Sequence, residues 1–238
     1  MFSKLALYGG LAALLASGSF AQTYLKGVYE ENPSKIDSSC KLPPLSNDPS
    51  NPVTDTSSVD LRCRTSNMNG PTVPYAVKAG SSIKLLFDAW KKSPITKRHL
   101  VGPCSFFLSK RSTKGEGEVW FLINQVATVD DKWCSSNIQK NGGIHTLAIP
   151  ANVTAGEYYL RTEISDSNKT DPEDLLFTSA KPQFYVDCIT LNIASSYSGE
   201  GPKNFISIPW DKKGSGSPNP DDGLVTIMND SMPTDSTL

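Results

Sequence analysis

The apolar residues follow the periodicity of β-strands, and this feature constrains the fold more than any other. Segments rich in β-branched and aromatic residues are separated by turn residues such as Gly80, Gly102-Pro103, Asn141–Gly143 and Gly156. No segment sustains an apolar pattern at a spacing of 3.6 residues, so we expect few and short helices. The pattern predicts an all-β chain folded as a β-sandwich. The predicted strands are Ser82–Trp90, Cys104–Lys110, Glu118–Asn124, Glu157–Ile164 and Gln183–Ala194.

The composition is that of one globular domain. Of the 238 residues 38% are hydrophobic, and 23 Lys and Arg stand against 24 Asp and Glu. This balance provides no basic surface for phosphates, so we expect no nucleic-acid partner. Three polar connections, residues 31–58, 91–101 and 165–182, have the length of functional loops. Residues 198–238 are rich in Gly, Pro, Ser and Asp, which is typical of a loose tail.

The first residues have the pattern of a secretory signal peptide. Lys4 precedes an apolar stretch, Leu5–Ala16, and the small-x-small sequence Ser19-Phe20-Ala21 follows. We therefore expect a signal peptide at 1–21, one domain at 22–230 that begins with Gln22, and a short polar tail at 231–238. The apolar stretch is too short to span a bilayer, so the expected product is secreted and has no membrane partner.

Secretion changes how the five cysteines are interpreted, because an oxidising compartment favours disulfides over free thiols and zinc sites. No Cys-x-x-Cys spacing occurs, and the odd count leaves at least one cysteine without an internal partner. Three tripeptides fit acceptors for N-glycosylation, which is consistent with a secreted surface. They begin at Asn152, Asn168 and Asn229.

The usual catalytic signatures are missing from the sequence: it has no G-x-S-x-G, P-loop, H-E-x-x-H or dinucleotide-binding motif. Glycoside hydrolysis needs two carboxyl groups that face each other across the scissile bond. Glu116, Glu118, Glu157 and Glu163 are candidates, but on strands and turns we expect them to be solvated.

An ordered series of motifs resembles the fungal cellulose-active lytic polysaccharide monooxygenases of auxiliary activity family 9. The resemblance covers roughly residues 22–226, and the order of the motifs is far more specific than any one of them. The motifs include Asn51-Pro-Val-Thr-Asp55, Val59-Asp-Leu-Arg-Cys63, Gly102-Pro-Cys104, Leu160-Arg-Thr-Glu-Ile164 and Gln183-Phe-Tyr-Val-Asp-Cys188.

The resemblance implies an immunoglobulin-like or fibronectin-III-like sandwich whose flat face lies on a polysaccharide, such as cellulose or another β-glucan. It also implies a copper cofactor held by a histidine brace, in which an N-terminal His supplies an amine and an imidazole and a second His supplies another imidazole. By motif, Tyr185 is the axial tyrosine and Gln183 the hydrogen-bonding glutamine. The family disulfide falls on Cys63 and Cys188. Cys104 with Cys134 is then a second candidate pair, which leaves Cys40 unpaired.

The histidine ligands are not retained in the same way. Gln22 stands where the family has its N-terminal His, and the sequence has no histidine before His99. His99 lies near the second ligand position, with a spacing one residue longer than the family motif, and a solvent-facing His99 is an equal alternative. His145 matches no ligand position, and we expect it at the surface of a strand edge. The family's second-shell His is replaced by Asn168.

Two functional classes remain at this stage. The first is a secreted, monomeric family member that binds a cell-wall polysaccharide with lost or altered oxidative activity. The second is an active copper monooxygenase with a site rebuilt from the N-terminal residue, His99 and Tyr185. A signalling or adhesive protein on the same scaffold is a weaker third class. Several aromatic residues near loops are candidates for stacking on sugar rings, and Trp210 in a polar loop is the foremost. The others are Tyr24, Tyr29, Tyr197 and Phe205.

Overall fold

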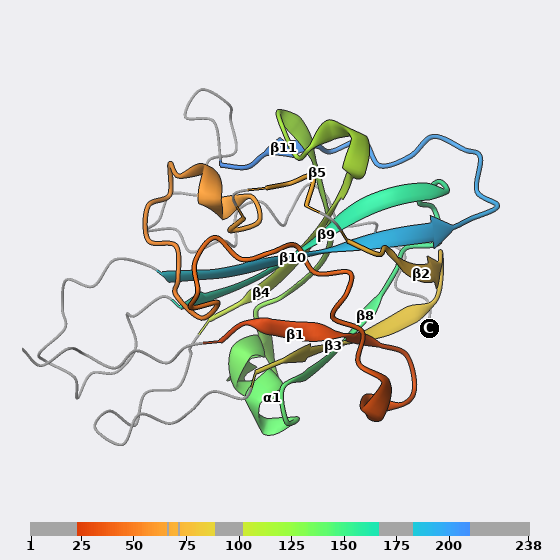
Figure 1. Ribbon diagram of the computed structural model, residues 1–238. Coiled ribbons are helices and arrows are strands. Elements are labelled where there is room, and N and C mark those ends of the chain that lie inside the picture. The colour runs from red at the N-terminus through yellow and green to blue at the C-terminus, as the bar shows by residue number, and fades with distance from the viewer. Residues whose placement is uncertain (1–22, 66, 71, 89–101, 167–182, 210–238) are drawn as a thin grey trace, which may run out of the picture.

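The chain folds into two β-sheets packed face to face (Figure 1). The computed structural model describes residues 23–65, 67–70, 72–88, 102–166 and 183–209. One sheet has three strands in the order β1-β3-β8, the other has six in the order β11-β5-β4-β9-β10-β2, and β6 and β7 form a small hairpin. This arrangement confirms the predicted β-sandwich. The strands are β1 (Leu25–Tyr29), β2 (Tyr75–Lys78), β3 (Ser82–Phe87), β4 (Cys104–Lys110), β5 (Glu118–Val126), β6 (Thr128–Val129), β7 (Lys132–Trp133), β8 (Ile144–Ala148), β9 (Gly156–Asp166), β10 (Gln183–Ala194) and β11 (Ile206–Ser207).

The predicted strands agree closely with β3, β4, β5, β9 and β10, and β4 and β10 have the predicted bounds. The shorter strands β2 and β8 were not predicted, because four or five residues carry too little alternation to stand out. Helices are few and short, as expected, in the part of the chain that the structure describes. They are α1 (Cys134–Lys140) and the 3₁₀ turns η1 (Pro33–Lys35), η2 (Val59–Leu61) and η3 (Arg111–Thr113).

The long strand β10 separates two hydrophobic clusters. Alternate residues of a strand point to opposite faces of its sheet. Tyr185, Ile189 and Leu191 pack into the core between the two sheets. Val186 and Cys188 point the other way, into a second cluster that includes Trp120 and Leu61 and that the connection after β1 covers. The polar connection 31–58 is therefore partly built into the fold, and Val53 pairs with Phe184 at the start of β10.

Two disulfides cross-link the sandwich: the pair expected from the resemblance and the second candidate pair. Cys63 is joined to Cys188 across a sequence separation of 125 residues, and Cys104 to Cys134 across 30. Cys40 is free and fully buried. Burial raises the pKa of the Cys40 thiol to about 12, so this cysteine remains a neutral thiol in the core.

The beginning of the Gly- and Pro-rich tail is structured, in agreement with the resemblance that extends to residue 226 and in contrast to what its composition alone indicates. β11 pairs with β5, and the next residue, Ile208, is 1% exposed in the second cluster. Composition alone could not show this, because two apolar residues are enough to dock a short strand. Within the described ranges no helix has the length and apolar character of a membrane span.

Candidate functional site

The strand ends that carry the predicted site residues meet at one end of the sandwich. β10 begins at Gln183, opposite the last residue of β9, and Tyr185 lies opposite Ile164, which in turn pairs with Cys104 at the start of β4. In the facing sheet the first residue of β1, Leu25, pairs with the last residue of β3. These ends lie together on the same side of the molecule in Figure 1. We refer to this region as the β10-start end.

Gln183 and Tyr185 lie side by side there, on the same face of β10. The Tyr185 hydroxyl donates a hydrogen bond of 2.8 Å to Oε1 of Gln183. Tyr185 is 2% exposed and Gln183 5% exposed, so the bond is shielded from water. A buried amide oxygen needs such a donor, because an unpaired one would be costly. The phenol and the amide thus form a fixed polar pair in the core.

The start of β1 is held near this pair by main-chain and side-chain contacts. The Leu25 amide donates to Oδ2 of Asp187 at 2.8 Å, and Asp187 is two residues beyond Tyr185 on the same face of β10. The Tyr24 carbonyl accepts from the Asp88 amide at 2.8 Å. Thr23 is 1% exposed. Gln22, the residue predicted to begin the mature chain, lies outside the described residues.

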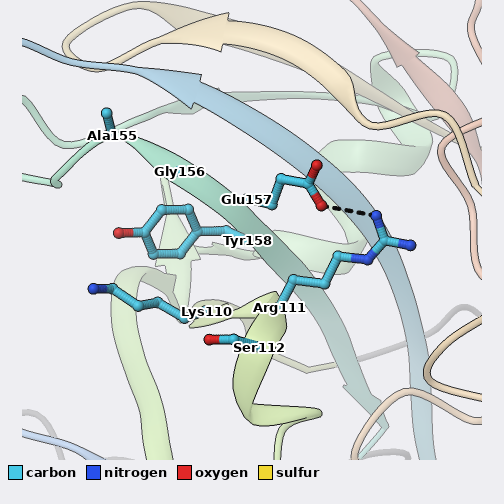
Figure 2. A pocket seen from close by; sticks show the side chains of 7 residues that line it. All are labelled: Lys110, Arg111, Ser112, Ala155, Gly156, Glu157 and Tyr158. Carbon is cyan, nitrogen blue, oxygen red and sulfur yellow. Dashed lines mark hydrogen bonds and ion pairs between the residues drawn. The ribbon is translucent and has the colours of Figure 1, made fainter.

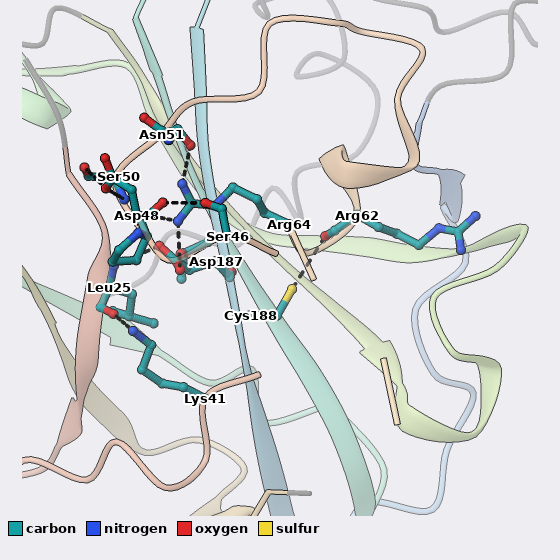
Figure 3. Close-up of polar contacts among 12 residues, drawn as sticks. Leu25, Lys41, Ser46, Asp48, Ser50, Asn51, Arg62, Arg64, Asp187 and Cys188 are labelled. Carbon is teal, nitrogen blue, oxygen red and sulfur yellow. Dashed lines mark hydrogen bonds and ion pairs between the residues drawn. The ribbon is translucent and has the colours of Figure 1, made fainter. Parts of the chain in front are cut away.

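Three charged side chains surround this strand start. Nη2 of Arg64 lies 3.5 Å from Oδ1 of Asp187, and Nζ of Lys41 donates to the Leu25 carbonyl (Figure 3). Burial raises the pKa of the Asp187 carboxyl, although Arg64 and Lys41 act to lower it. Burial lowers the pKa of the Lys41 ammonium, because it disfavours the charged form. None of these three residues was predicted as a site residue. A sequence signal existed for Asp187 alone, because it follows Gln183 and Tyr185 at every second position of one strand.

The structure describes one of the two histidines, His145. His99 lies outside the described residues. His145 lies on the edge strand β8, as expected, but its side chain is half-buried and so less exposed than expected. Its ring stacks on Phe106 with centroids 4.5 Å apart. Burial lowers the pKa of His145 to about 4, so the imidazole is neutral at physiological pH.

Among the described residues the donor atoms do not make up a copper brace with two imidazoles, because His145 is their only histidine. The β10-start end offers a phenol and an amide that are bonded to each other. Among the described residues no cluster of three or more His, Cys, Asp or Glu side chains could hold a metal ion. Because the chain has two histidines, a brace with two imidazoles would need both His99 and His145, and the His145 ring is stacked on Phe106.

The candidate carboxylates have ordinary structural partners. Glu163 is 1% exposed and accepts from Arg161 at 2.5 Å and from Ser165 at 3.2 Å, so the expectation of a solvated Glu163 was wrong. Its position on a sheet face covered by the connection after β1 explains the burial. Glu157 pairs with Arg111 at 2.9 Å and Glu116 lies 3.7 Å from Arg62, both with exposed carboxylates, and Glu118 is exposed.

A shallow hollow of about 440 Å³ lies at the opposite end of β9, far from Tyr185 (Figure 2). Lys110, Arg111 and Ser112 line one side, and Gly156–Tyr158 line the other. Glu157 pairs with Asn192, nine residues along β10 from Gln183, which places the hollow at the other end of the sandwich. The Arg111–Glu157 ion pair occupies part of it.

The remaining predicted positions are distributed as follows. Asn152 is exposed in the turn that precedes β9. Tyr29 is 3% exposed, whereas Phe205 is 42% exposed with its ring edge-on to Phe121. Asn168, Trp210 and Asn229 lie outside the described residues.

A model of auxiliary activity family 9 (formerly GH61) matches residues 17–231 of this chain. The chain belongs to auxiliary activity family 9. The match includes every described strand, both disulfides and the Gln183–Tyr185 pair. It confirms the family that the order of the motifs indicated.

Curated relatives of this family 9 chain are themselves lytic polysaccharide monooxygenases. It is 25% identical over 212 residues to family 9 monooxygenase A of Aspergillus fumigatus, covering 87% of this chain and 57% of the relative. It is 27% identical over 219 residues to monooxygenase B of Heterobasidion irregulare, covering 85% of this chain and 79% of the relative. The chain thus spans little more than half the length of the Aspergillus fumigatus relative.

Solved structures share the fold of this family 9 chain. CvAA9A superposes with a TM-score of 0.66 at 18% identity and covers 82% of this chain and 88% of its own. A cellulose-active polysaccharide monooxygenase from M. thermophila superposes with a TM-score of 0.58 at 19% identity and covers 92% of this chain and 94% of its own. At these sequence identities the structural likeness establishes the β-sandwich fold and not a function.

Proposed function

We propose that this protein is a secreted family 9 member that binds cellulose or a related cell-wall β-glucan, with lost or altered oxidative activity. One observation carries the proposal: Tyr185 and Gln183, at the family positions, form a buried hydrogen-bonded pair, whereas Gln22 stands where the family has its N-terminal His. An amide such as that of Gln22 is a weak copper ligand in comparison with an imidazole. Copper dependence is therefore not part of the proposed function.

Binding can be separated from oxidation in physical terms. Adsorption to a polysaccharide depends on aromatic stacking and on hydrogen bonds to sugar rings, and neither needs a metal. The two disulfides that cross-link the sandwich do not involve a metal. We therefore expect adsorption to persist after chelation.

The test uses the secreted, processed protein in pull-down experiments with cellulose, other β-glucans, xylan and chitin, with and without a chelator. We expect adsorption to a β-glucan that the chelator leaves unchanged, and no oxidised oligosaccharides when reductant and peroxide are supplied. Trp210→Ala should weaken adsorption by roughly 1 to 3 kcal/mol, the scale of one well-stacked aromatic.

Two results would overturn the proposal. Adsorption to none of the four polysaccharides would remove the binding function and favour a different surface interaction. Tight stoichiometric copper that is lost in His99→Ala, together with oxidised products, would establish an active monooxygenase with a rebuilt site.

A further inference from the structure

Leu25, the first residue of β1, forms backbone hydrogen bonds with charged side chains and not with another strand on that side. β1 is an edge strand of its sheet. Edge strands present N–H and C=O groups that need partners. The Leu25 N–H donates to the carboxylate of Asp187, and the Leu25 carbonyl accepts from the ammonium of Lys41 (Figure 3). Asp187 and Lys41, from other parts of the chain, thus provide the hydrogen-bond partners of these two backbone groups.

The same carboxylate also organises a loop. Oδ1 of Asp187 lies 3.5 Å from the Arg64 guanidinium, which donates in turn to the carbonyls of Pro49 and Asn51. The side chains of Arg64 and Asp187 are 7% and 12% exposed. One side chain of β10 therefore connects the start of β1 with residues 46–51, two segments far apart in the sequence.

Stability alone does not explain a buried ionic group of this kind. The cost of removing charges from water largely offsets their mutual attraction, and well-packed apolar residues can stabilise a fold as much. What an ionic group adds is direction, because a carboxylate fixes each donor at a defined angle and distance. The group also lies on the face of β10 that carries Gln183 and Tyr185.

We infer that Asp187 is a positioning residue: with Lys41 and Arg64 it forms a clamp that fixes the start of β1 and residues 46–51 beside the Gln183–Tyr185 pair. The clamp thereby shapes the surface at the β10-start end. That this surface is the one that meets the polysaccharide rests on the proposed function. Glu157, in its ion pair with Arg111 at the far end of the sandwich, provides a matched control.

The clamp is tested by amide hydrogen exchange of the full processed protein under native conditions. In Asp187→Ala we expect exchange at Leu25 and in residues 46–51 to be at least tenfold faster, with central amides of β9 and β10 unchanged. Asp187→Asn keeps an acceptor for the Leu25 N–H but loses the charge that attracts Arg64. It should restore most protection at Leu25 and little in residues 46–51.

The exchange experiment has a control variant, Glu157→Gln, and results that would contradict the clamp. Glu157→Gln should leave both segments as in the wild type. Unchanged exchange in Asp187→Ala, or an equal rise in all amides, would overturn the clamp. If Asp187→Ala does not fold, the contrast between the two segments in Asp187→Asn decides the question, and no contrast refutes it.

Adsorption to cellulose tests whether the clamp shapes the binding surface. We expect at least fivefold weaker adsorption for Asp187→Ala or, if that variant does not fold, for Asp187→Asn, and wild-type adsorption for Glu157→Gln. Wild-type adsorption together with fast local exchange would overturn the link to binding. A wild-type protein that binds no polysaccharide would refute the proposed function, whereas the exchange data would still decide on the clamp.

Discussion

His145 should make the fold less stable as the pH falls from about 6.5 to about 4. Burial against Phe106 lowers its pKa from the ordinary value of 6.5 to about 4, and no charged neighbour contributes to the shift. Between these values the unfolded chain binds a proton that the folded chain does not, so stability is full above pH 6.5 and is lost on acidification. A shift of this size corresponds to about 3 kcal/mol once the pH is below both values.

Urea unfolding measured between pH 3.5 and 7.5 tests this, with His145→Phe as the variant, because a phenyl ring can keep the stacking and does not titrate. Its free energy of unfolding should lose about 3 kcal/mol less than that of the wild type over this range. His99→Gln removes the other imidazole of the chain and serves as the matched control. Parallel pH profiles for the wild type and His145→Phe would refute the assignment.

Three further predictions concern the disulfides, the buried pair and copper. Replacing Cys63 and Cys188 with Ala should destabilise the fold by about 5 kcal/mol in the chain-entropy model, because the closed loop spans 125 residues. Replacing Cys104 and Cys134 should cost about 3 to 4 kcal/mol, because that loop spans 30 residues. Thermal unfolding of both variants ranks the two losses, and a reversed order would contradict the loop-length argument. Tyr185→Phe leaves Oε1 of Gln183 without its hydroxyl donor and should destabilise by about 1 to 2 kcal/mol in urea unfolding, whereas no loss would show that the pair is dispensable. Gln22→His should strengthen copper binding measured by calorimetry on the processed protein, because it supplies an imidazole, and an unchanged affinity would mean that the missing ligand is not at this position.

Much of the fold and part of the candidate site followed from the sequence. The runs of β-branched and aromatic residues in β4 and β10 gave their bounds, because strands covered on both faces are enriched in such residues. The motif order gave Tyr185 and Gln183, which the fold brings into a hydrogen bond. The burial of Glu163 and His145 was missed, because burial depends on what covers a sheet face and not on the residues beside them in the chain.

The sequence by itself determined the family, the strand pattern and the shortage of histidines, since each of these is a property of residue identity and local spacing. Only the tertiary structure decided how the start of β1 is held. Leu25 and Asp187 are separated by 162 residues, and their contact exists because two sheets pack so that an edge strand of one faces the inner side of β10. No local pattern carries that information, because a charged side chain on a strand looks the same in sequence whether it meets water or a buried N–H group.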